Sequence, residues 1–193
     1  MTRMALAERR QKLIEAALAV IGQQGVSAAT TRAIASEAEM PLASFHYAFE
    51  SHQALMSEAM EVLDRLEREH CEGLVISGAT LPEMVTGMLE NHLDDLVERR
   101  SAYLSRWELA DHALRTDAMQ ERPAQWRQRR RELVAGKVAA HLASHPELGG
   151  HDARAVTEAM LVMCDGIEAR YLVTADEAGT RQAIAALAST FTR

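Results

Sequence analysis

Apolar residues recur every three to four positions along nearly the whole of this 193-residue chain, and that spacing is typical of helices with one buried face. Stretches that alternate apolar with polar residues and are rich in Val, Ile, Thr and Tyr are missing, so no β-sheet is expected. Only ten glycines and four prolines interrupt the helical pattern. The sequence therefore predicts an all-α fold of about nine helices.

The composition excludes several classes of protein. Hydrophobic residues make up 48% of the chain and charged residues 25%, which is typical of a folded globular protein. No apolar run approaches the roughly 18 residues of a membrane span, and the N-terminus lacks the pattern of a signal peptide. Cys71 and Cys164 lie far apart in the sequence and form no CxxC motif. We therefore expect a cytoplasmic protein without a disulfide, metal ion or cofactor.

The first fifty residues predict three short helices. An amphipathic helix is expected from residue 5 to residue 24. Thr30 or Thr31 caps a second helix of about eight residues, and Pro41 suits the first position of a third helix that runs to Tyr47. Two short helices joined by a tight turn bury little by themselves, so the first helix is expected to pack behind them. Residues 1–50 are thus predicted to form a helix-turn-helix domain with one helix facing outward.

One segment of this domain carries a specific pattern. It consists of Thr30-Thr31-x-x-Ile34-Ala35-x-x-Ala38, the run Pro41–Phe49, and then Ser51 and Leu55. The pattern resembles the head of the TetR family of transcriptional repressors. The resemblance implies a recognition helix in the major groove at Pro41–Tyr47 and a phosphate contact at Thr31. The residues expected to contact DNA are Thr31, Arg32, Pro41, Leu42, Ala43, Ser44, His46, Tyr47 and His52. Of these, Leu42, Ala43 and Ser44, at the exposed start of the recognition helix, are expected to meet base edges.

Four positions differ from the pattern of that family, and one of them is Ala43, which stands where a glycine is expected early in the recognition helix. Glu39 stands where a turn glycine is expected, so a left-handed backbone there would cost on the order of 1 kcal/mol. His46 matches a tyrosine that contacts phosphate, and His52 matches a lysine at the start of the fourth helix. Because histidine gains charge as the pH falls from about 8 to 6, we predict that DNA affinity rises over that range.

Longer helices are expected over residues 51–193, which form the second predicted domain. The spacing Thr80-x-x-Glu83 predicts a capping box, and Asp152 is expected to cap another helix. That helix is apolar almost all round between Ala159 and Ile167, which predicts that it is centrally buried. The expected helices cover about 51–72, 80–99, 101–114, 116 or 123 to 144, 152–174 and 180–191.

The resemblance implies that this second domain binds a small molecule and forms a homodimer. Methionines on its helices can line an adaptable apolar cavity, or they can simply fill the core. An apolar effector is expected in a pocket formed by Met60, Met84, Met88, His92, Tyr103, Trp107, Glu108, Met160, Met163 and Ile167. The last two helices carry more apolar surface than one chain can cover. The dimer interface is expected at Leu161, Gly166, Ala169, Leu172, Ile184, Leu187, Ala188 and Phe191.

Two further clusters have competing interpretations. His141 and His145 have a spacing compatible with zinc, but they can equally be surface histidines at a helix end. The arginine-rich run Arg127–Arg131 could bind an anion, or it could be the solvated face of a long helix, balanced by Glu121 and Glu132. We favour the surface interpretation in both cases.

Charge is distributed unevenly along the chain. The net charge of −7 argues against a nucleic-acid-binding protein when the chain is taken as a whole. The first 36 residues nevertheless carry a net charge of +3, and the remainder carries −10. A basic head on an acidic body would turn the head toward DNA.

Together these features predict a ligand-responsive transcriptional repressor that binds a palindromic operator as a homodimer and releases it when an inducer binds. The sequence has no phosphate-binding glycine loop and no nucleophile elbow, so no enzymatic activity is expected. An activator role is compatible with the same sequence. The competing class is a helical small-molecule-binding protein or enzyme whose head does not touch DNA, and it predicts no salt-sensitive DNA binding.

Overall fold

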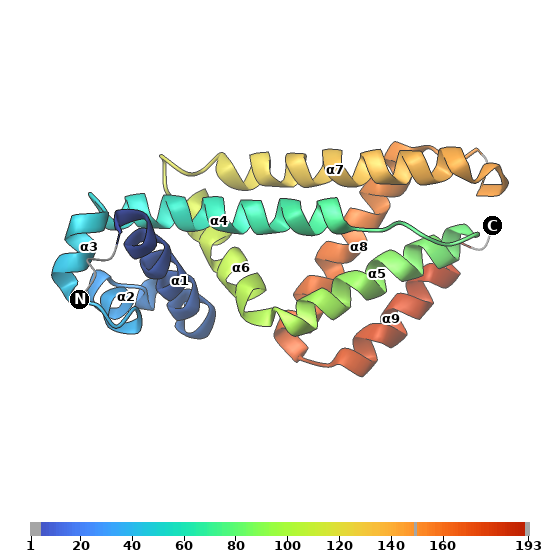
Figure 1. Ribbon diagram of the computed structural model, residues 1–193. Helices are drawn as coiled ribbons and strands as arrows, with labels where there is room; N and C mark the ends of the chain where they lie inside the picture. The colour runs from blue at the N-terminus through green and yellow to red at the C-terminus, as the bar shows by residue number, and fades with distance from the viewer. Residues whose placement is uncertain (1–4, 149, 192–193) are drawn as a thin grey trace. The chain divides into compact units, whose positions relative to one another are not determined.

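The computed structural model describes residues 5–148 and 150–191, and all regular secondary structure in these ranges is helical, which confirms the predicted all-α fold (Figure 1). Among these residues no helix is both long and apolar enough to cross a membrane. The elements are α1 (Leu6–Gln24), the 3₁₀ helix η1 (Val26–Ala28), α2 (Thr31–Glu37), α3 (Leu42–Ala48), α4 (His52–Gly73), α5 (Leu81–Glu98), α6 (Arg100–Leu114), α7 (Arg122–Ser144), the 3₁₀ helix η2 (Pro146–Leu148), α8 (Ala153–Thr174) and α9 (Glu177–Ser189).

The described chain divides into two compact units. The head unit holds the chain up to Leu66 together with Ser101–Trp126. The body unit holds Glu67–Arg100 together with the chain from Arg127 onward. These limits do not coincide with the predicted boundary at residue 50, because the segment after that residue also belongs to the head unit.

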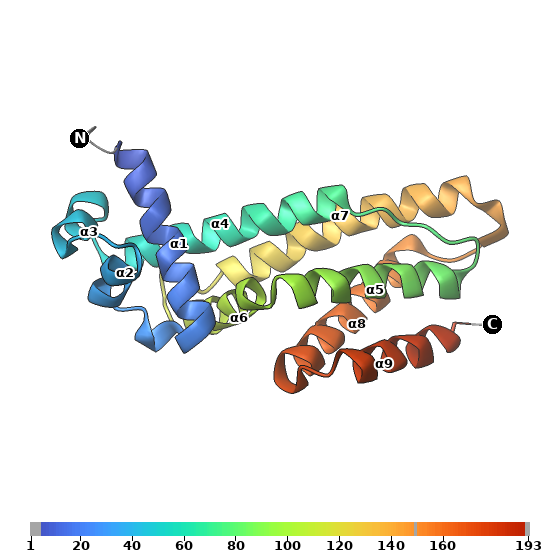
Figure 2. The same cartoon turned by 60° about the horizontal axis from the view of Figure 1, so that its bottom comes forward.

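One apolar core holds the head unit together. α2 and α3 pack against α1 (Figures 1 and 2), and Ile34 and Phe45 place their side chains in the same core as Leu13. The first turns of α4 enter this core through Leu55 and Met56, both of which are fully buried. The short helices of the head therefore depend on α1 and α4 for their stability.

Local signals set the bounds of α2 and α3. The Thr30 hydroxyl accepts a hydrogen bond from the Ala33 N–H at 3.2 Å, so Thr30 rather than Thr31 caps α2. Pro41 is the cap residue of α3, whereas the sequence predicts it as the first helical residue. The turn between the two helices places Glu39 at a φ of +53°, the left-handed conformation that the missing glycine predicts.

α6 packs closely on α1 within the head unit. A Cβ atom on Gly22 would lie 2.6 Å from the carbonyl oxygen of Ser101. The Ser105 hydroxyl donates a hydrogen bond to the Leu18 carbonyl oxygen at 2.8 Å. Only a residue without a side chain at position 22 permits this approach.

In the body unit, α5 packs against both α8 and α9. The predicted capping box opens α5: the Thr80 hydroxyl accepts from the Glu83 N–H at 3.3 Å, and the Glu83 carboxylate accepts from the Thr80 N–H at 3.1 Å. The Asp152 carboxylate accepts from the Arg154 N–H at 3.0 Å and caps α8, again as predicted.

α8 is buried on one face only. Met160, Cys164 and Ile167 are buried, whereas Val162 is 68% exposed and Val173 is 83% exposed. The prediction that this helix is centrally buried is therefore wrong for the single chain, because neighbouring helices cover only one of its faces.

α9 begins one turn earlier than predicted, at Glu177 instead of Thr180. The Asp176 carboxylate caps the helix by accepting a hydrogen bond from the Gly179 N–H at 2.8 Å. The Thr180 hydroxyl is buried and donates to the Asp176 carbonyl oxygen at 2.6 Å. The sequence offers two capping residues here, and the aspartate takes the role.

Candidate nucleic-acid interface and ligand pocket

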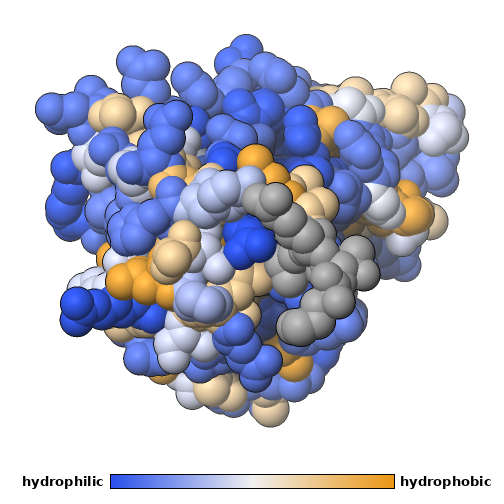
Figure 3. Space-filling view, turned by 60° about the vertical axis from the view of Figure 1, so that its left-hand side comes forward, coloured by the Kyte–Doolittle hydropathy of each residue, from blue (hydrophilic) through white to orange (hydrophobic). Residues whose placement is uncertain are grey.

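One face of α3 is open to solvent on the head unit, while Phe45 on the opposite face is buried. Five of the residues expected to contact DNA lie on this helix or at its start and are accessible. Pro41, Ala43, His46 and Tyr47 are exposed, and Leu42 is half-buried. At the start of α2, Arg32 is exposed and Thr31 is half-buried. The face of the molecule seen in Figure 3 is mainly hydrophilic, with apolar residues in small patches. A short helix with a free outer face is the arrangement that helix-turn-helix proteins place in the major groove.

Ser44 does not belong to this exposed face. Only 7% of the residue is exposed, and its hydroxyl accepts a hydrogen bond from Arg9 Nη1 of α1 at 2.7 Å. The expectation that Ser44 lies at an exposed position and reads bases is therefore corrected: its side chain turns inward, toward α1.

The two histidines of the head differ in their surroundings. His46 is exposed, and its ring meets the edge of the Phe45 ring at a centroid distance of 5.7 Å. His52 is half-buried, and its Nε2 lies 2.6 Å from the Ala29 carbonyl oxygen, which requires that Nε2 carry a proton and donate. His52 thus ties the start of α4 to the segment before α2.

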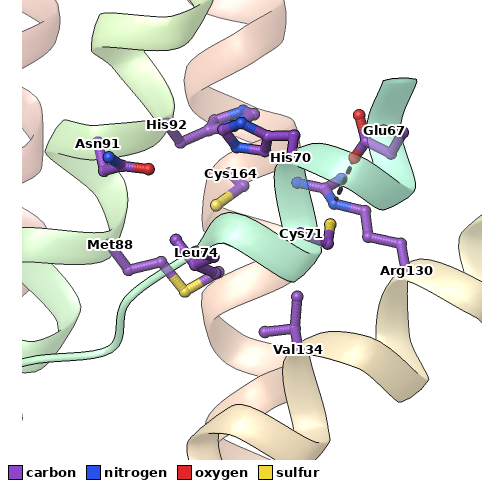
Figure 4. A pocket seen from close by; sticks show the side chains of 10 residues that line it. All are labelled: Glu67, His70, Cys71, Leu74, Met88, Asn91, His92, Arg130, Val134 and Cys164. Atoms are coloured by element: carbon purple, nitrogen blue, oxygen red, sulfur yellow. Dashed lines mark ion pairs between the residues drawn. The ribbon is translucent and has the colours of Figure 1, made fainter. Parts of the chain in front are cut away.

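The body unit contains a small, partly open pocket between α4, α5, α7 and α8 (Figure 4). Its volume is about 20 Å³, which is room for one water molecule and far below the roughly 300 Å³ or more of a typical small-molecule pocket. Figure 4 shows the ion pair between Glu67 and Arg130 at one side of the pocket and Leu74 and Met88 at the other. The lining residues are Glu67, His70, Cys71, Leu74, Met88, Asn91, His92, Arg130, Val134 and Cys164.

Arg130 is a largely buried positive charge in this lining. Its Nε lies 3.1 Å from Glu67 Oε1, and its Nη1 lies 3.1 Å from Asp165 Oδ1. Burial opposes the charge, but the surrounding carboxylates outweigh burial and raise the pKa of Arg130 above its ordinary value. The prediction that the arginine-rich run is a solvated face balanced by Glu121 and Glu132 is wrong here, because carboxylates from α4 and α8 neutralise Arg130.

Burial favours the uncharged form of two other lining groups. It raises the pKa of the Cys164 thiol to about 12, so this thiol is a poor nucleophile. It also lowers the pKa of the His70 imidazole, although Asp95 at 3.4 Å acts in the opposite direction. The guanidinium of Arg130 is thus the permanent positive charge of the lining, and its carboxylate partners already neutralise it.

An open groove adjoins this pocket and shares His70, Leu74 and Asn91 with it. The volume of the groove is about 340 Å³. No lysine or arginine lines the groove, but four carboxylates do: Glu69, Asp94, Asp95 and Glu98.

Carboxylates and helix ends both shape the charge of this groove. Arg181 pairs with Asp94 at 2.6 Å, and Arg99 pairs with Asp95. The groove also follows the last turns of α4 and α5, where the backbone carbonyl groups give each helix end a partial negative charge. A positively charged ligand group is favoured at this place.

Two family profiles match the chain. The profile for bacterial regulatory proteins of the TetR family matches residues 13–59, and the profile for the C-terminal part of BetI-type transcriptional repressors matches residues 81–193. The chain belongs to the TetR family. This membership confirms the family that the residues of the head predict, and it makes the chain a transcriptional regulator rather than an enzyme.

Individual relatives support the same assignment. The nicotine-responsive transcriptional repressor HdnoR of Paenarthrobacter nicotinovorans is 45% identical over 67 residues, which is 34% of either chain, so the match spans about a third of the length of that relative. A TetR transcription regulator from Haloarcula marismortui has a TM-score of 0.76 at 18% identity, over 96% of each chain. The multidrug binding protein EbrR, solved with ethidium, has a TM-score of 0.58 at 28% identity, over 93% of this chain and 98% of that one.

In this TetR-family chain, two of the residues predicted for the effector pocket line the pocket shown in Figure 4: Met88 and His92. Of the others in the body unit, Met84, Met160 and Ile167 are buried outside the pocket lining, and Met163 is half-buried. Four belong to the head unit, where Met60 and Tyr103 are buried and Trp107 and Glu108 are exposed. Two of the ten predicted residues thus meet in this pocket, and the rest of the set stays a prediction, because methionine fills cores as readily as it lines cavities.

The residues predicted for the dimer interface also divide. Leu172, Ile184 and Ala188 are buried within their own chain, so their place in an interface is corrected. Gly166 and Leu187 are exposed, while Leu161, Ala169 and Phe191 are half-buried. The open face of α8 carries Val162, Gly166, Ala169 and Val173 at helical spacing.

The histidine cluster has a structural role. His141 is buried with its Nε2 2.9 Å from the Gly78 carbonyl oxygen, and its ring stacks on His145 at 4.1 Å. Within residues 5–148 and 150–191, no group of three or more His, Cys, Asp or Glu side chains is placed to hold a metal ion. Cys71 and Cys164 are both buried free thiols.

The sequence interpretation missed eight of the ten lining residues of the pocket. Glu67 and Cys71 share one face of α4 by their spacing, but so do core residues of any helix. The informative signal was a charged residue within an apolar face: Arg130 and Glu67 have complementary charges on two separate helices. Only the tertiary structure shows that these two residues meet.

Proposed function

We propose that this TetR-family regulator is a repressor that binds a palindromic operator as a homodimer and releases it when a small molecule enters the body unit. The observation that carries the proposal is the exposed outer face of α3, which a buried inner face fixes to the core of the head unit. Direct contacts to bases would come from Leu42, Ala43 and Tyr47, and phosphate contacts from Thr31, Arg32 and His46.

The homodimer is supported by the uncovered apolar surface of α8 and α9. Val162 and Val173 are largely exposed on α8, and Leu187 is 37% exposed on α9. A single head reads only a few base pairs, and two heads related by a two-fold axis read both halves of a palindrome. Burial of this face in a second copy satisfies both requirements.

The proposed effector site is the small pocket together with the groove beside it. Its apolar lining, from Leu74, Met88 and Val134, agrees with the apolar effector that the sequence predicts. The carboxylates of the groove favour a ligand with a positively charged group as well. Two relatives are associated with such compounds: HdnoR responds to nicotine, and EbrR was solved with ethidium. We therefore propose an apolar, positively charged effector.

The test begins with selection of bound sequences from a random pool of duplex DNA by the purified full-length protein. We expect a palindromic sequence whose affinity falls steeply with rising salt concentration. Arg32→Ala should weaken binding to all duplexes alike, whereas Tyr47→Ala should change which sequence is preferred. Binding that is absent or insensitive to salt would support the competing class, a helical protein that does not act on DNA.

The second step measures release of the selected duplex. Ethidium serves as the cationic aromatic probe, and an uncharged aromatic compound of similar size serves as its control. We expect release by ethidium and weaker release by the uncharged compound. A cationic probe that does not intercalate, tested beside ethidium, separates release through the protein from direct binding of ethidium to the DNA. Release by both compounds alike would contradict the preference for positive charge.

A further inference from the structure

Arg9 of α1 contacts two residues of α3. Its Nη1 donates to the buried Ser44 hydroxyl at 2.7 Å, and its guanidinium carbon lies 5.6 Å from the centre of the Tyr47 ring. Ser44 and Tyr47 are three positions apart and therefore neighbours on the helix surface. Arg9 thus spans the turn of α3 that carries the exposed Tyr47 on one side and the inward Ser44 on the other.

Arg10, the next residue of α1, contacts the end of the same helix. It donates a hydrogen bond to the carbonyl oxygen of Ala48, the last residue of α3, and forms an ion pair with Glu58 of α4. Its guanidinium carbon lies 4.4 Å from the centre of the Phe49 ring. Two adjacent arginines therefore hold α3 in its middle and at its C-terminus.

α3 depends on such contacts for its orientation. It has only seven residues, and isolated helices of that length are unstable in water. Its buried face is small, because Phe45 is its one large side chain in the core. The polar contacts from α1 thus supply directional constraints that the apolar contacts do not.

We propose that Arg9 and Arg10 are positioning residues that determine which DNA sequence the protein prefers. They fix the rotation of α3 about its own axis, and with it the bases that Leu42, Ala43 and Tyr47 meet. This inference rests on the proposed binding to DNA. An arginine that only bound phosphate would strengthen binding to every sequence alike, because phosphate contacts carry no sequence information.

The experiment compares the affinities for the selected operator and for a random duplex at three salt concentrations. Arg9→Lys keeps the positive charge but removes the planar donor group, and Ser44→Ala removes its acceptor. Lys12→Ala is the matched control, since Lys12 is an exposed cation on the same helix. Thermal unfolding of each variant measures whether the head remains folded.

We expect Arg9→Lys and Ser44→Ala each to lower the ratio of operator to random affinity by about tenfold, with the salt dependence unchanged. The double variant should lower the ratio no further, because both changes remove the same contact. Arg10→Lys should also lower the ratio. Lys12→Ala should weaken binding to both duplexes equally or leave both unchanged.

Two results would overturn the positioning role. One is a ratio that stays within twofold of the original protein in both Arg9→Lys and Ser44→Ala, and the other is an equal loss on both duplexes, which would make Arg9 a phosphate contact. If the original protein itself shows no preferred sequence, the proposed function fails instead. Ser44→Ala is a small change at a buried site, so it decides the question even where Arg9→Lys lowers stability.

Discussion

Glu39 carries a local cost in the turn of the head. It is exposed, and its φ of +53° lies in the left-handed region, which disfavours residues with a side chain by roughly 1–2 kcal/mol. Nothing in the structure of the described residues explains why a glutamate stands at this position. The turn keeps its conformation because α2 and α3 are both fixed to α1.

Glu39→Gly is expected to raise the free energy of unfolding by about 0.5–1 kcal/mol, since glycine adopts this conformation without strain but loses more entropy on folding. Urea denaturation followed by circular dichroism measures the change. Glu37→Gly, two residues earlier and inside α2, should lower the free energy of unfolding by about 1 kcal/mol. A lower free energy of unfolding in Glu39→Gly would show that contacts of the Glu39 side chain stabilise the fold by more than the left-handed backbone destabilises it.

Glu39 and Ser44 show what a sequence reveals at the level of single residues. The left-handed turn could be predicted, because the requirement is local and the position within the motif fixes it. The inward turn of Ser44 could not, because its partner Arg9 lies 35 residues away and a serine suits an exposed or a buried position equally. Local geometry is encoded locally, whereas the partner of a polar side chain is a tertiary property.

Between elements, the contact of α1 with α6 has the least room for change. The Cβ that any other residue would add at Gly22 meets the Ser101 carbonyl oxygen at 2.6 Å and the Ser101 hydroxyl at 2.4 Å. A side chain can rotate away, but a backbone carbonyl can move only with its helix. Gly22 therefore fixes how closely the two helices approach.

Gly22→Ala is expected to lower the free energy of unfolding by about 1–3 kcal/mol, the usual cost of overpacking, although alanine is the better helix former. Gly136→Ala is the control: no atom outside its own helix segment lies within 4 Å of the added Cβ, so this change should stabilise α7 by about 0.5–1 kcal/mol. Calorimetric unfolding of both variants compares them. Equal stabilisation by both changes would mean that α6 shifts at no cost.

Helix bounds were predictable where the cap is a property of adjacent residues. Thr80 with Glu83 and Asp152 fixed two starts correctly. α9 was placed three residues too late because Asp176 and Thr180 both suit a cap. The pocket was missed almost entirely, since its lining combines four helices and no periodicity within one helix indicates which neighbour it faces.

For the whole molecule, the open face of α8 predicts assembly. Val162→Glu should abolish the dimer, because it places a charge in the centre of the proposed interface while Val162 contributes little to the fold of one chain, being 68% exposed. Light scattering at micromolar concentration should show a monomer with unchanged helix content. Operator affinity should fall by about 100-fold or more, since a single head loses half of the base contacts.

Val75→Glu is the matched control for this change. Val75 is 79% exposed but belongs to the segment between α4 and α5, not to α8 or α9. We expect it to leave the dimer intact. A dimer that survives Val162→Glu, or a monomer in the unaltered protein, would overturn the interface.

The small size of the pocket has a consequence for the proposed effector site. The groove has room for part of an organic effector, but a pocket of about 20 Å³ cannot take its apolar part until the surrounding helices separate, so the form proposed to bind the effector is a minor state of the free protein. Each ~1.4 kcal/mol needed to open the pocket raises the effector concentration at half-response about tenfold. Packing around Met88 and Val134 therefore helps to set the effector concentration at half-response. Substitutions at these residues should change that concentration without altering any residue proposed to contact DNA.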